Sequence, residues 1–306
     1  MSSIETVSVV GAGAMGAVYA SMFFEMDRNC ISLVAKGERY ERLKKTGLIV
    51  NNVHYSVPLR NPDDKGSPSD LIIVAVKHHH LPQAIHDIRG IVGANSIILS
   101  VMNGIDSEEQ IGAVYGMDRV LYTVAIGIDA VREENRITYT TKGKFLFGEA
   151  RNPLITGRVK RVQSLLDRVG IVWETPKDMI RSLWWKFMIN VGINQASAVL
   201  RAPYSVFQSS QEARGLMESA MREVMALARA AGVHLAEGDL EDWYSVLYGL
   251  GPEGKTSMLQ DMEAGRKTEV EMFAGRVTDL GKRYGIPTPV NETLLRIIKV
   301  MEQYRD

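Results

Sequence analysis

A short stretch near the N-terminus constrains the fold of this chain more than any other: a β-branched run that leads directly into a glycine-rich turn. Residues 6–10 read TVSVV, GAGAMG follows at 11–16, and AVYASMFFEM at 17–26 has helical character. A strand, a glycine turn and a helix in this order are the context in which G-x-G-x-x-G indicates a dinucleotide site. A glycine turn that is purely structural is the alternative.

The glycines of this turn have separate tasks. Gly11 permits the tight turn, Gly13 lets a pyrophosphate come close to the backbone, and Gly16 lets the helix pack on the strand. Backbone N–H groups at the start of the helix have no partner within it, so they can face an anion. We therefore predict cofactor contacts from the whole turn, which consists of Gly11, Ala12, Gly13, Ala14, Met15 and Gly16.

The residue after the second strand bears on which dinucleotide is bound. CISLVA at 30–35 is followed by Lys36, Gly37, Glu38 and Arg39. An NAD site usually has Asp or Glu at this point, about 20 residues after the glycines, to bond the ribose 2′-hydroxyl. Lys36, with or without Arg39, suits a 2′-phosphate instead and favours NADP. Glu38 weakens the charge argument, and a solvated turn is the alternative.

Two continuous apolar runs predict further strands, LIIVAVK at 71–77 and SIILSVMNG at 96–104, with a helical segment between them. This alternation predicts a mostly parallel sheet, in which ligands bind beyond the carboxyl ends of the strands. Lys77 and Asn103 occupy such ends, although a lysine that closes a strand and an Asn-Gly turn are both commonplace. Strand-like runs continue to about residue 176, so we expect an α/β domain over residues 1–176.

Composition excludes several classes of protein. Among the 306 residues, 36 basic side chains balance 36 acidic ones, which argues against nucleic acid or an anionic membrane as a partner. The chain lacks the run of about 18 apolar residues that a membrane span needs. The strand-like start leaves no room for a signal peptide, and the single cysteine, Cys30, excludes an intrachain disulfide. We expect a cytoplasmic protein.

Three adjacent histidines, His78, His79 and His80, invite comparison with a metal site. Neighbouring side chains point in different directions, whereas a metal ion needs converging ligands. The cysteine and the other histidines are scattered along the sequence. We therefore predict no metal site.

After Pro176 the pattern changes to long helical periodicity, which predicts an all-helical domain over residues 177–306, with helices at 178–200, 210–231, 237–249, 267–284 and 289–304. On the first helix, Lys186, Asn190 and Asn194 recur every four residues among apolar side chains. Four residues advance an α-helix by about 6 Å and by about 40° beyond a full turn, so the three form one polar stripe. Such a stripe is a candidate ligand site; a lysine that snorkels at a helix edge is the alternative.

A second polar segment, KTSMLQDMEAGRKTEVEMFAG at 255–275, contains Ser257 and, twelve residues later, Glu269. Serine is favoured as a helix cap, so Ser257 has an ordinary explanation. Glu269 and Glu271 could likewise form a solvated helix face. Taken singly, neither Ser257 nor Glu269 indicates a function.

Together these motifs resemble the ketopantoate reductase family, also called 2-dehydropantoate 2-reductases. GAGAMG, AVK, MNG, WWKFMINVGINQASAV, TSMLQDMEAGRKTEVE and GIPTPVN occur in the order and at the spacing of the family, over nearly the whole chain. The resemblance implies a Rossmann-type domain followed by an all-α domain. It also implies NADPH-dependent reduction of 2-dehydropantoate to (R)-pantoate, a step toward pantothenate and coenzyme A, with a 2-oxo acid as small-molecule partner and a homodimer left open.

Carried over position by position, the resemblance assigns roles to the candidates. Lys186 matches the general acid that protonates the carbonyl oxygen. Substrate-binding positions are Asn103, Asn190, Asn194 and Ser257. Further cofactor-binding positions, beside the glycine turn and Lys36, are Lys77, Asn103, Ala130 and Glu269. Burial would lower the pKa of Lys186 and a nearby Glu269 would raise it, and the sequence leaves that balance open.

The chain departs from the family pattern at two positions. Met102 replaces the more usual Gln before Asn103, which bears on the substrate pocket, and Lys36 replaces a frequent Arg, which bears on the NADP preference. Two rival functions follow: a reductase of another 2-oxo acid, and a redox-sensing NADP-binding protein without turnover. The second predicts a broken catalytic set, yet the set is complete.

Overall fold

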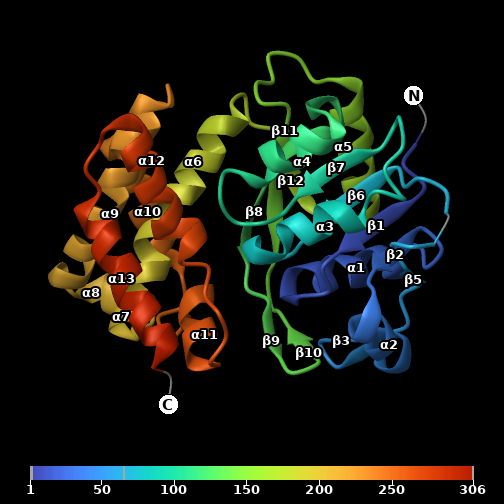
Figure 1. Ribbon diagram of the computed structural model, residues 1–306, viewed down its shortest axis with the longest axis horizontal. Coiled ribbons are helices and arrows are strands. Elements are labelled where there is room, and N and C mark those ends of the chain that lie inside the picture. Colours follow the sequence, from blue (N-terminus) through green and yellow to red (C-terminus); the bar gives the residue numbers. More distant parts are fainter. Residues whose placement is uncertain (1–2, 65, 305–306) are drawn as a thin grey trace. The chain divides into compact units, whose positions relative to one another are not determined.

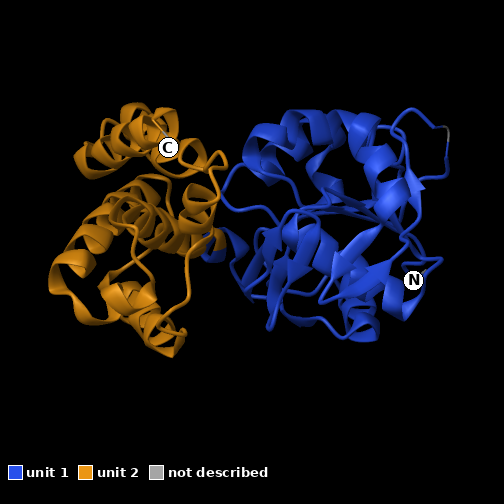
Figure 2. Cartoon of the chain, turned by 90° about the horizontal axis from the view of Figure 1, so that it is seen from below, with its two compact units in different colours: residues 1–182 blue, residues 183–306 orange. Residues whose placement is uncertain are grey.

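The computed structural model describes residues 3–64 and 66–304, which form two compact units (Figure 2). Unit 1 ends at Ser182 and unit 2 begins at Leu183, within helix α6 (Met179–Ile189). The sequence led us to expect a boundary between residues 176 and 177. All strands of the described residues belong to unit 1, and unit 2 is helical, which confirms the expected fold class.

The main sheet of unit 1 has eight strands among the described residues, in the order β12-β11-β8-β7-β6-β1-β2-β5 (Figure 1). Neighbours are parallel except for β8 and β11, which confirms the mostly parallel sheet. The strands are β1 (Val7–Val10), β2 (Ile31–Val34), β5 (Leu59–Arg60), β6 (Leu71–Val74), β7 (Ile97–Ser100), β8 (Val120–Ile128), β11 (Lys142–Gly148) and β12 (Val172–Glu174).

Helices cover both faces of this sheet, so successive residues of one strand enter different cores. Val9 packs in the core that includes α1 and α5, whereas Val10 packs in the core that includes α3 and α4. A strand buried on both faces appears in the sequence as a continuous apolar run, which is why these strands were predictable. The helices of unit 1 are α1 (Ala14–Met26), α2 (Gly37–Thr46), α3 (Leu81–Asp87), α4 (Ser107–Tyr115) and α5 (Gly157–Val169).

A second, four-stranded sheet in unit 1, with the order β4-β3-β10-β9, was not predicted. Its strands are β3 (Leu48–Val50), β4 (Val53–Tyr55), β9 (Val131–Glu133) and β10 (Arg136–Thr138). Each is only three residues long, too short for a periodic pattern. Because β10 pairs with β3, this sheet ties the segment after β8 to residues far earlier in the chain.

Unit 2 contains the five predicted helical segments and two further short helices. Its elements are the end of α6, η3 (Asn190–Asn194), α7 (Gln195–Leu200), α8 (Tyr204–Ser209), α9 (Gln211–Ala230), α10 (Glu237–Gly249), α11 (Ser257–Glu263), η4 (Glu271–Gly275), α12 (Arg276–Tyr284) and α13 (Pro289–Gln303). The short helices α8 and α11 were not predicted. Within the described part of the chain, every helix is too short or too polar to cross a membrane.

The segments η3 and η4 are π-helical turns. In η4, the N–H of Gly275 donates to the carbonyl oxygen of Val270, five residues earlier, at 3.0 Å. An α-helical period does not anticipate such a turn, so both were missed. Single π turns within α-helices occur frequently at functional sites.

Candidate active site

The glycine turn joins β1 to α1 in unit 1, and crowding requires two of its glycines. Gly11 has a φ of +101°, and a Cβ there would lie 2.4 Å from the carbonyl oxygen of Ala75. A Cβ on Gly16 would lie 1.9 Å from the carbonyl oxygen of Gly11. Both separations are far shorter than a van der Waals contact, so neither position accepts a side chain without a backbone shift.

Gly13 differs, because a Cβ there would meet no protein atom within 4 Å. Gly13 is the N-cap of α1, and no side chain caps the first N–H groups of this 13-residue helix. Helix N-termini carry partial positive charge and bind anions. Open space against uncapped donors therefore fits the pyrophosphate of a dinucleotide.

The other candidates of unit 1 follow four parallel strands at the same edge of the sheet. Lys36 comes after β2, Lys77 after β6, Asn103 after β7 and Ala130 after β8. Between β2 and β6 lies β1, where the strand order changes direction, and ligands of open α/β sheets bind at such switch points. Unit 1 thus brings its predicted cofactor residues to one edge, with Lys77, Asn103 and Ala130 partly buried.

The ammonium group of Lys36 is held by a carboxylate. Its Nζ lies 2.7 Å from Oδ1 of Asp87, the last residue of α3. The same oxygen accepts a hydrogen bond from Nε2 of Gln83 at 2.7 Å. Lys36 and Asp87 are 51 residues apart, so the sequence pattern did not reveal this pair.

Arg132, in β9, is a second side chain at the turn that sequence reasoning missed. Its Nη1 donates to the carbonyl oxygen of Ala12 at 3.3 Å, and its Nε donates to that of Glu134 at 2.8 Å. A guanidinium next to an anion-binding turn adds positive charge there. Arg132 follows Ala130 by two residues, which is the signal that could have drawn attention to it.

The predicted lysine helix is formed by α6, η3 and α7 in succession. At its start, Oδ1 of Asp178 accepts the N–H of Arg181 at 2.9 Å, as an N-cap does. Lys186 is partly buried as a residue, and the burial of its ammonium group lowers the pKa of that group to about 8. The balance that the sequence left open therefore falls on the side of burial. A group with this pKa is mostly protonated at neutral pH and gives up its proton readily.

Asn190 and Asn194 are the first and last residues of the π turn η3, and they are only 4% and 6% exposed. The stripe was predicted from α-helical spacing, and the wider π turn changes the angle between the two amides from the one that this spacing gives.

A buried amide supports this turn from behind. Gln195 is fully buried; its Nε2 donates to the carbonyl oxygen of Val191 at 2.7 Å and to Oδ1 of Asn291 at 3.0 Å. Its Oε1 accepts the N–H of Ala274 at 3.1 Å. Since Ala274 belongs to η4, one side chain connects the two π turns.

Asn291, in the GIPTPVN motif, extends the network to α9. Its Nδ2 donates to Oε2 of Glu223 at 2.6 Å and to the carbonyl oxygen of Ala220 at 3.2 Å. Glu223 also accepts the backbone N–H groups of Val290, at 2.8 Å, and of Asn291, at 3.0 Å. The network thus fixes the start of α13 and both π turns against α9.

The structure corrects one alternative for Ser257. The N-cap of α11 is Thr256, whose hydroxyl accepts the N–H of Leu259 at 3.2 Å. Ser257 is the first residue of α11 and is exposed, so capping does not explain it. Glu269 is partly buried just before η4, and its carbonyl oxygen accepts the N–H of Met272 at 3.0 Å.

Unit 2 gathers its candidates around η3. This turn packs against α11, which begins at Ser257, and against η4, which Glu269 precedes. Lys186 lies one turn of helix before Asn190. Residues that are far apart in the sequence therefore meet at one segment, and their roles toward a ligand stay predictions.

Two family descriptions match the chain. Residues 7–152 match "Ketopantoate reductase PanE/ApbA", and residues 178–302 match "Ketopantoate reductase PanE/ApbA C terminal". The chain belongs to the ketopantoate reductase family. It is therefore an oxidoreductase by family.

Similar proteins differ in what they are described as doing. The "Uncharacterized oxidoreductase YkpB" of Bacillus subtilis is 25% identical over 299 residues, which cover 96% of this chain and 98% of that protein. The structure of 2-dehydropantoate 2-reductase from Geobacter metallireducens is 27% identical with a TM-score of 0.84, covering 96% and 99%. The ternary structure of D-mandelate dehydrogenase with NADH and anilino(oxo)acetate is 21% identical with a TM-score of 0.86, covering 97% and 98%.

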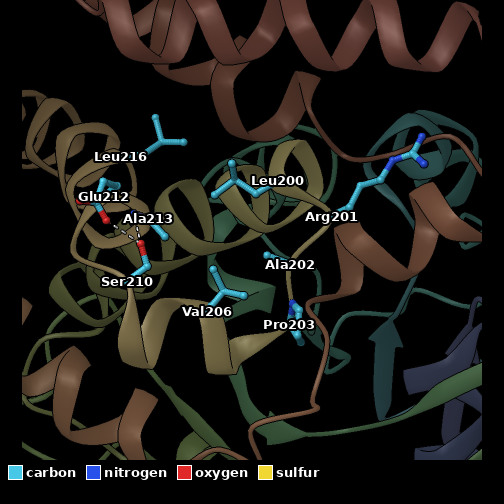
Figure 3. A pocket seen from close by; sticks show the side chains of 9 residues that line it. All are labelled: Leu200, Arg201, Ala202, Pro203, Val206, Ser210, Glu212, Ala213 and Leu216. Carbon is cyan, nitrogen blue, oxygen red and sulfur yellow. Dashed lines mark hydrogen bonds between the residues drawn. The ribbon is translucent and has the colours of Figure 1, made fainter.

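A surface pocket of about 390 Å³ in unit 2 contains none of the candidate residues (Figure 3). Its few polar groups serve the local structure: Oγ of Ser210 caps α9 by accepting the N–H of Ala213 at 3.2 Å, and it donates to Glu212 at 3.0 Å. The carboxylate in its lining, Glu212, accepts this hydrogen bond from Ser210. Its lining consists of Leu200, Arg201, Ala202, Pro203, Val206, Ser210, Glu212, Ala213 and Leu216.

The three adjacent histidines do not belong to the candidate site residues either. His78, His79 and His80 form the short 3₁₀ turn η1 (His78–His80), which follows Lys77 after β6. Over residues 3–64 and 66–304, no three His, Cys, Asp or Glu side chains are grouped so that they could hold a metal ion. Burial, followed by the positive charges of Arg39 and Lys77, lowers the pKa of His80.

Proposed function

We propose that this chain reduces a 2-oxo acid with a nicotinamide dinucleotide, using NADPH and converting 2-dehydropantoate to (R)-pantoate. The observation that carries the proposal is Lys186, an ammonium group with a pKa of about 8 among the apolar residues 183–189, followed by two amides four residues apart. Membership of the family supports it. Cytoplasmic location and a homodimer stay predictions.

Lys186 is the proposed general acid. Reduction of a ketone builds negative charge on the carbonyl oxygen, so the site needs a donor directed at that atom. Nζ of Lys186 gives its proton to this oxygen, and its pKa near 8 suits transfer close to neutral pH. The helix that carries Lys186 is tied down by the Gln195 network, which limits misplacement of the donor.

The substrate is held by neutral polar groups in this proposal. Asn190 and Asn194 bond the hydroxyl and carboxylate groups of the 2-oxo acid, because amides can both donate and accept without adding charge. Ser257 is proposed to bind the carboxylate. Its side chain is exposed, and it is not needed as a helix cap because Thr256 caps α11. Asn103 contributes from the cofactor side.

The dinucleotide is held by the glycine turn, with its pyrophosphate against the uncapped N-terminus of α1. When bound, it supplies the hydride. Lys36 is proposed to meet the 2′-phosphate of NADP, and the remaining proposed contacts come from Lys77, Asn103, Ala130 and Glu269. The fit of the pyrophosphate at Gly13 is independent of whether NADP or NAD is preferred.

A reductase of a different 2-oxo acid is the second candidate. The similarity to the structure of D-mandelate dehydrogenase with anilino(oxo)acetate favours it, as does Met102 in place of the more usual Gln. An aromatic substrate has no terminal hydroxyl, so one amide of Asn190 or Asn194 would lose a partner, at about 1–3 kcal/mol.

The test is NADPH oxidation, followed by absorbance, with 2-dehydropantoate, 2-oxoisovalerate and an aromatic 2-oxo acid in parallel and with NADH as a second reductant. We expect kcat/KM for 2-dehydropantoate to exceed the others by at least about tenfold, which corresponds to about 1.4 kcal/mol of transition-state discrimination. A different preferred acid would overturn the substrate and leave the reductase. Absence of turnover with every 2-oxo acid, together with tight NADPH binding, would favour the sensor.

A further inference from the structure

The ion pair of Lys36 with Asp87 has a consequence for the choice of dinucleotide, and this consequence rests on the proposed function. The Lys36 side chain is 41% exposed and that of Asp87 is 14% exposed, so the lysine lies at the surface and the carboxylate is largely covered. Lys36 is also the N-cap residue of α2, directly after β2, where the adenosine ribose of a dinucleotide binds in this type of sheet. A 2′-phosphate that binds at this point therefore meets a Lys36 that is already paired with Asp87.

Asp87 is placed where a carboxylate is unfavourable without partners. It is the last residue of α3, and the C-terminal end of a helix carries partial negative charge. Lys36 at 2.7 Å, the Gln83 amide at 2.7 Å and the His86 ring at 3.7 Å surround its Oδ1. The carboxylate therefore depends on Lys36, and a phosphate that binds Lys36 draws that ammonium away from it.

We propose that Asp87 is a specificity-determining residue of the dinucleotide site: its carboxylate competes with a 2′-phosphate for Lys36 and thereby narrows the preference for NADP over NAD. The competition acts on the phosphate alone. A 2′-hydroxyl carries no charge to exchange for the carboxylate, so NAD is bound without disturbing the pair. The chain then accepts both cofactors more evenly than a chain whose basic residue at this position is unpaired.

The experiment measures equilibrium binding of NADPH, NADH, 2′-AMP and 5′-AMP to the full chain by fluorescence or calorimetry, without turnover. The variants are Asp87→Asn, Lys36→Gln and the double variant. Asn at position 87 keeps an oxygen for the Gln83 amide and removes the charge, so the fold is expected to persist. Asp63→Asn, an exposed carboxylate in a loop of the same unit, controls for the general effect of removing one negative charge.

We expect Asp87→Asn to tighten NADPH and 2′-AMP about three- to fivefold, the range expected for release of a partly exposed ion pair, and to leave NADH and 5′-AMP within about twofold. In the Lys36→Gln background, Asp87→Asn should no longer tighten NADPH binding, because the ammonium group for which Asp87 competes is then absent. Asp63→Asn should change none of the four constants.

Three results would overturn the inference: equal tightening of NADH and NADPH, a gain that persists without Lys36, or weaker NADPH binding in Asp87→Asn. The last would mean that Asp87 orients Lys36 for the phosphate rather than competing with it. A wild-type chain that binds neither dinucleotide would instead refute the proposed function itself. The two failures are therefore distinguishable from the wild-type titrations alone.

Discussion

The glycine turn of unit 1 and the polar helix of unit 2 are both interruptions of regular structure, but they are specified in different ways. The turn is encoded by adjacent residues, since Gly11 and Gly16 exclude any side chain through contacts with each other and with Ala75. The π turn η3 depends on partners far away in sequence, since Gln195 holds it to η4 and to Asn291. A single sequence reveals a turn that neighbouring residues determine, but it does not reveal a turn that distant residues hold in place.

The two regions also differ in what they offer a ligand. The turn presents backbone N–H groups, which any anion of suitable shape can use. The helix of unit 2 presents side chains instead, the ammonium group of Lys186 and the amides of Asn190 and Asn194. We expect changes in unit 1 to alter affinity for the dinucleotide, and changes in unit 2 to alter the chemical step or the affinity for the 2-oxo acid.

The largest effect is expected from Lys186→Ala. Loss of the general acid should lower kcat by about 10²–10⁴-fold, while the dissociation constant for NADPH, measured by fluorescence, stays within about twofold of wild type. Lys282→Ala, an exposed lysine near the end of α12, serves as the matched control. Wild-type turnover in Lys186→Ala would remove Lys186 from the mechanism.

The pH profile sharpens the same assignment. Burial holds the pKa of Lys186 at about 8, so the ammonium is protonated below that pH and loses its proton above it. We expect kcat for reduction to be level below about pH 8 and to fall about tenfold per pH unit above it, because the proton donor is lost. Steady-state kinetics from pH 6 to 10, with NADPH binding measured over the same range, checks this. A level profile up to pH 10 would contradict the assignment.

A pair of glycine variants tests unit 1. In Gly16→Ala the new Cβ would meet the carbonyl oxygen of Gly11, so we expect a loss of about 1–3 kcal/mol in the free energy of unfolding together with weaker dinucleotide binding. In Gly13→Ala the Cβ has space, so stability should hold while NADPH affinity falls at least about tenfold, because the methyl group takes the space meant for the pyrophosphate. Denaturation and NADPH titration of both variants separate the two roles; equal effects on stability would refute the distinction.

Gln195→Leu tests the support of the π turns. It removes the hydrogen-bond partner of the Val191 carbonyl, of the Ala274 N–H and of Oδ1 of Asn291, so we expect a loss of about 2–4 kcal/mol in the free energy of unfolding. We also expect a higher KM for the 2-oxo acid with unchanged NADPH binding. Gln208→Leu is the matched control, since its amide also makes two hydrogen bonds, to the carbonyls of residues 247 and 250, away from η3. A rise in KM in both variants would point to general loosening of unit 2.

The smallest effects are expected at two adjacent residues of unit 2. Thr256→Ala removes the cap of α11 and should cost about 1 kcal/mol of stability with little change in KM. Ser257→Ala should do the opposite, leaving stability unchanged and raising KM for the 2-oxo acid a few fold, by about 1 kcal/mol of lost hydrogen bonding. Thermal denaturation beside steady-state kinetics resolves them. If the two variants behaved alike, Ser257 would have no role of its own.

The sequence predicted those parts of the molecule that residues close together determine. The buried strands are visible in the sequence as apolar runs, and the glycine turn is visible as a motif of spaced glycines. The fold class, with an α/β region followed by a helical region, was therefore predictable. The three-residue strands β3, β4, β9 and β10 carry too little pattern, and pairing of β3 with β10 joins segments more than 80 residues apart.

The residues of the candidate site came from local spacing and from the resemblance, and their roles stay predictions, whereas the contacts that support these residues were not predicted. The stripe of Lys186, Asn190 and Asn194 followed from helical spacing, whereas the π turn within it did not. The sequence did not predict the pairing of Lys36 with Asp87 or of Arg132 with Ala12, because each pair joins residues of elements that are distant in the sequence. The resemblance to a family named the roles, and the structure supplied the low pKa of Lys186 and the pairing of Lys36.

A π turn contains one residue more than the α turn it replaces, so η3 works as a register shift built into the helix. Every residue after it is rotated by about 100° relative to an uninterrupted α-helix of the same start. That rotation is what turns Gln195 toward Ala274 and Asn291. Returning this turn to regular α-helix without removing a residue would turn Gln195 away from both partners, whereas deleting one residue between positions 190 and 194 at the same time would cancel the rotation and leave Gln195 facing them. In this segment chain length itself carries information, because an aligned relative with one residue fewer here keeps the direction of Gln195 with an ordinary α-helix but has no counterpart of the π turn that holds Asn190 and Asn194.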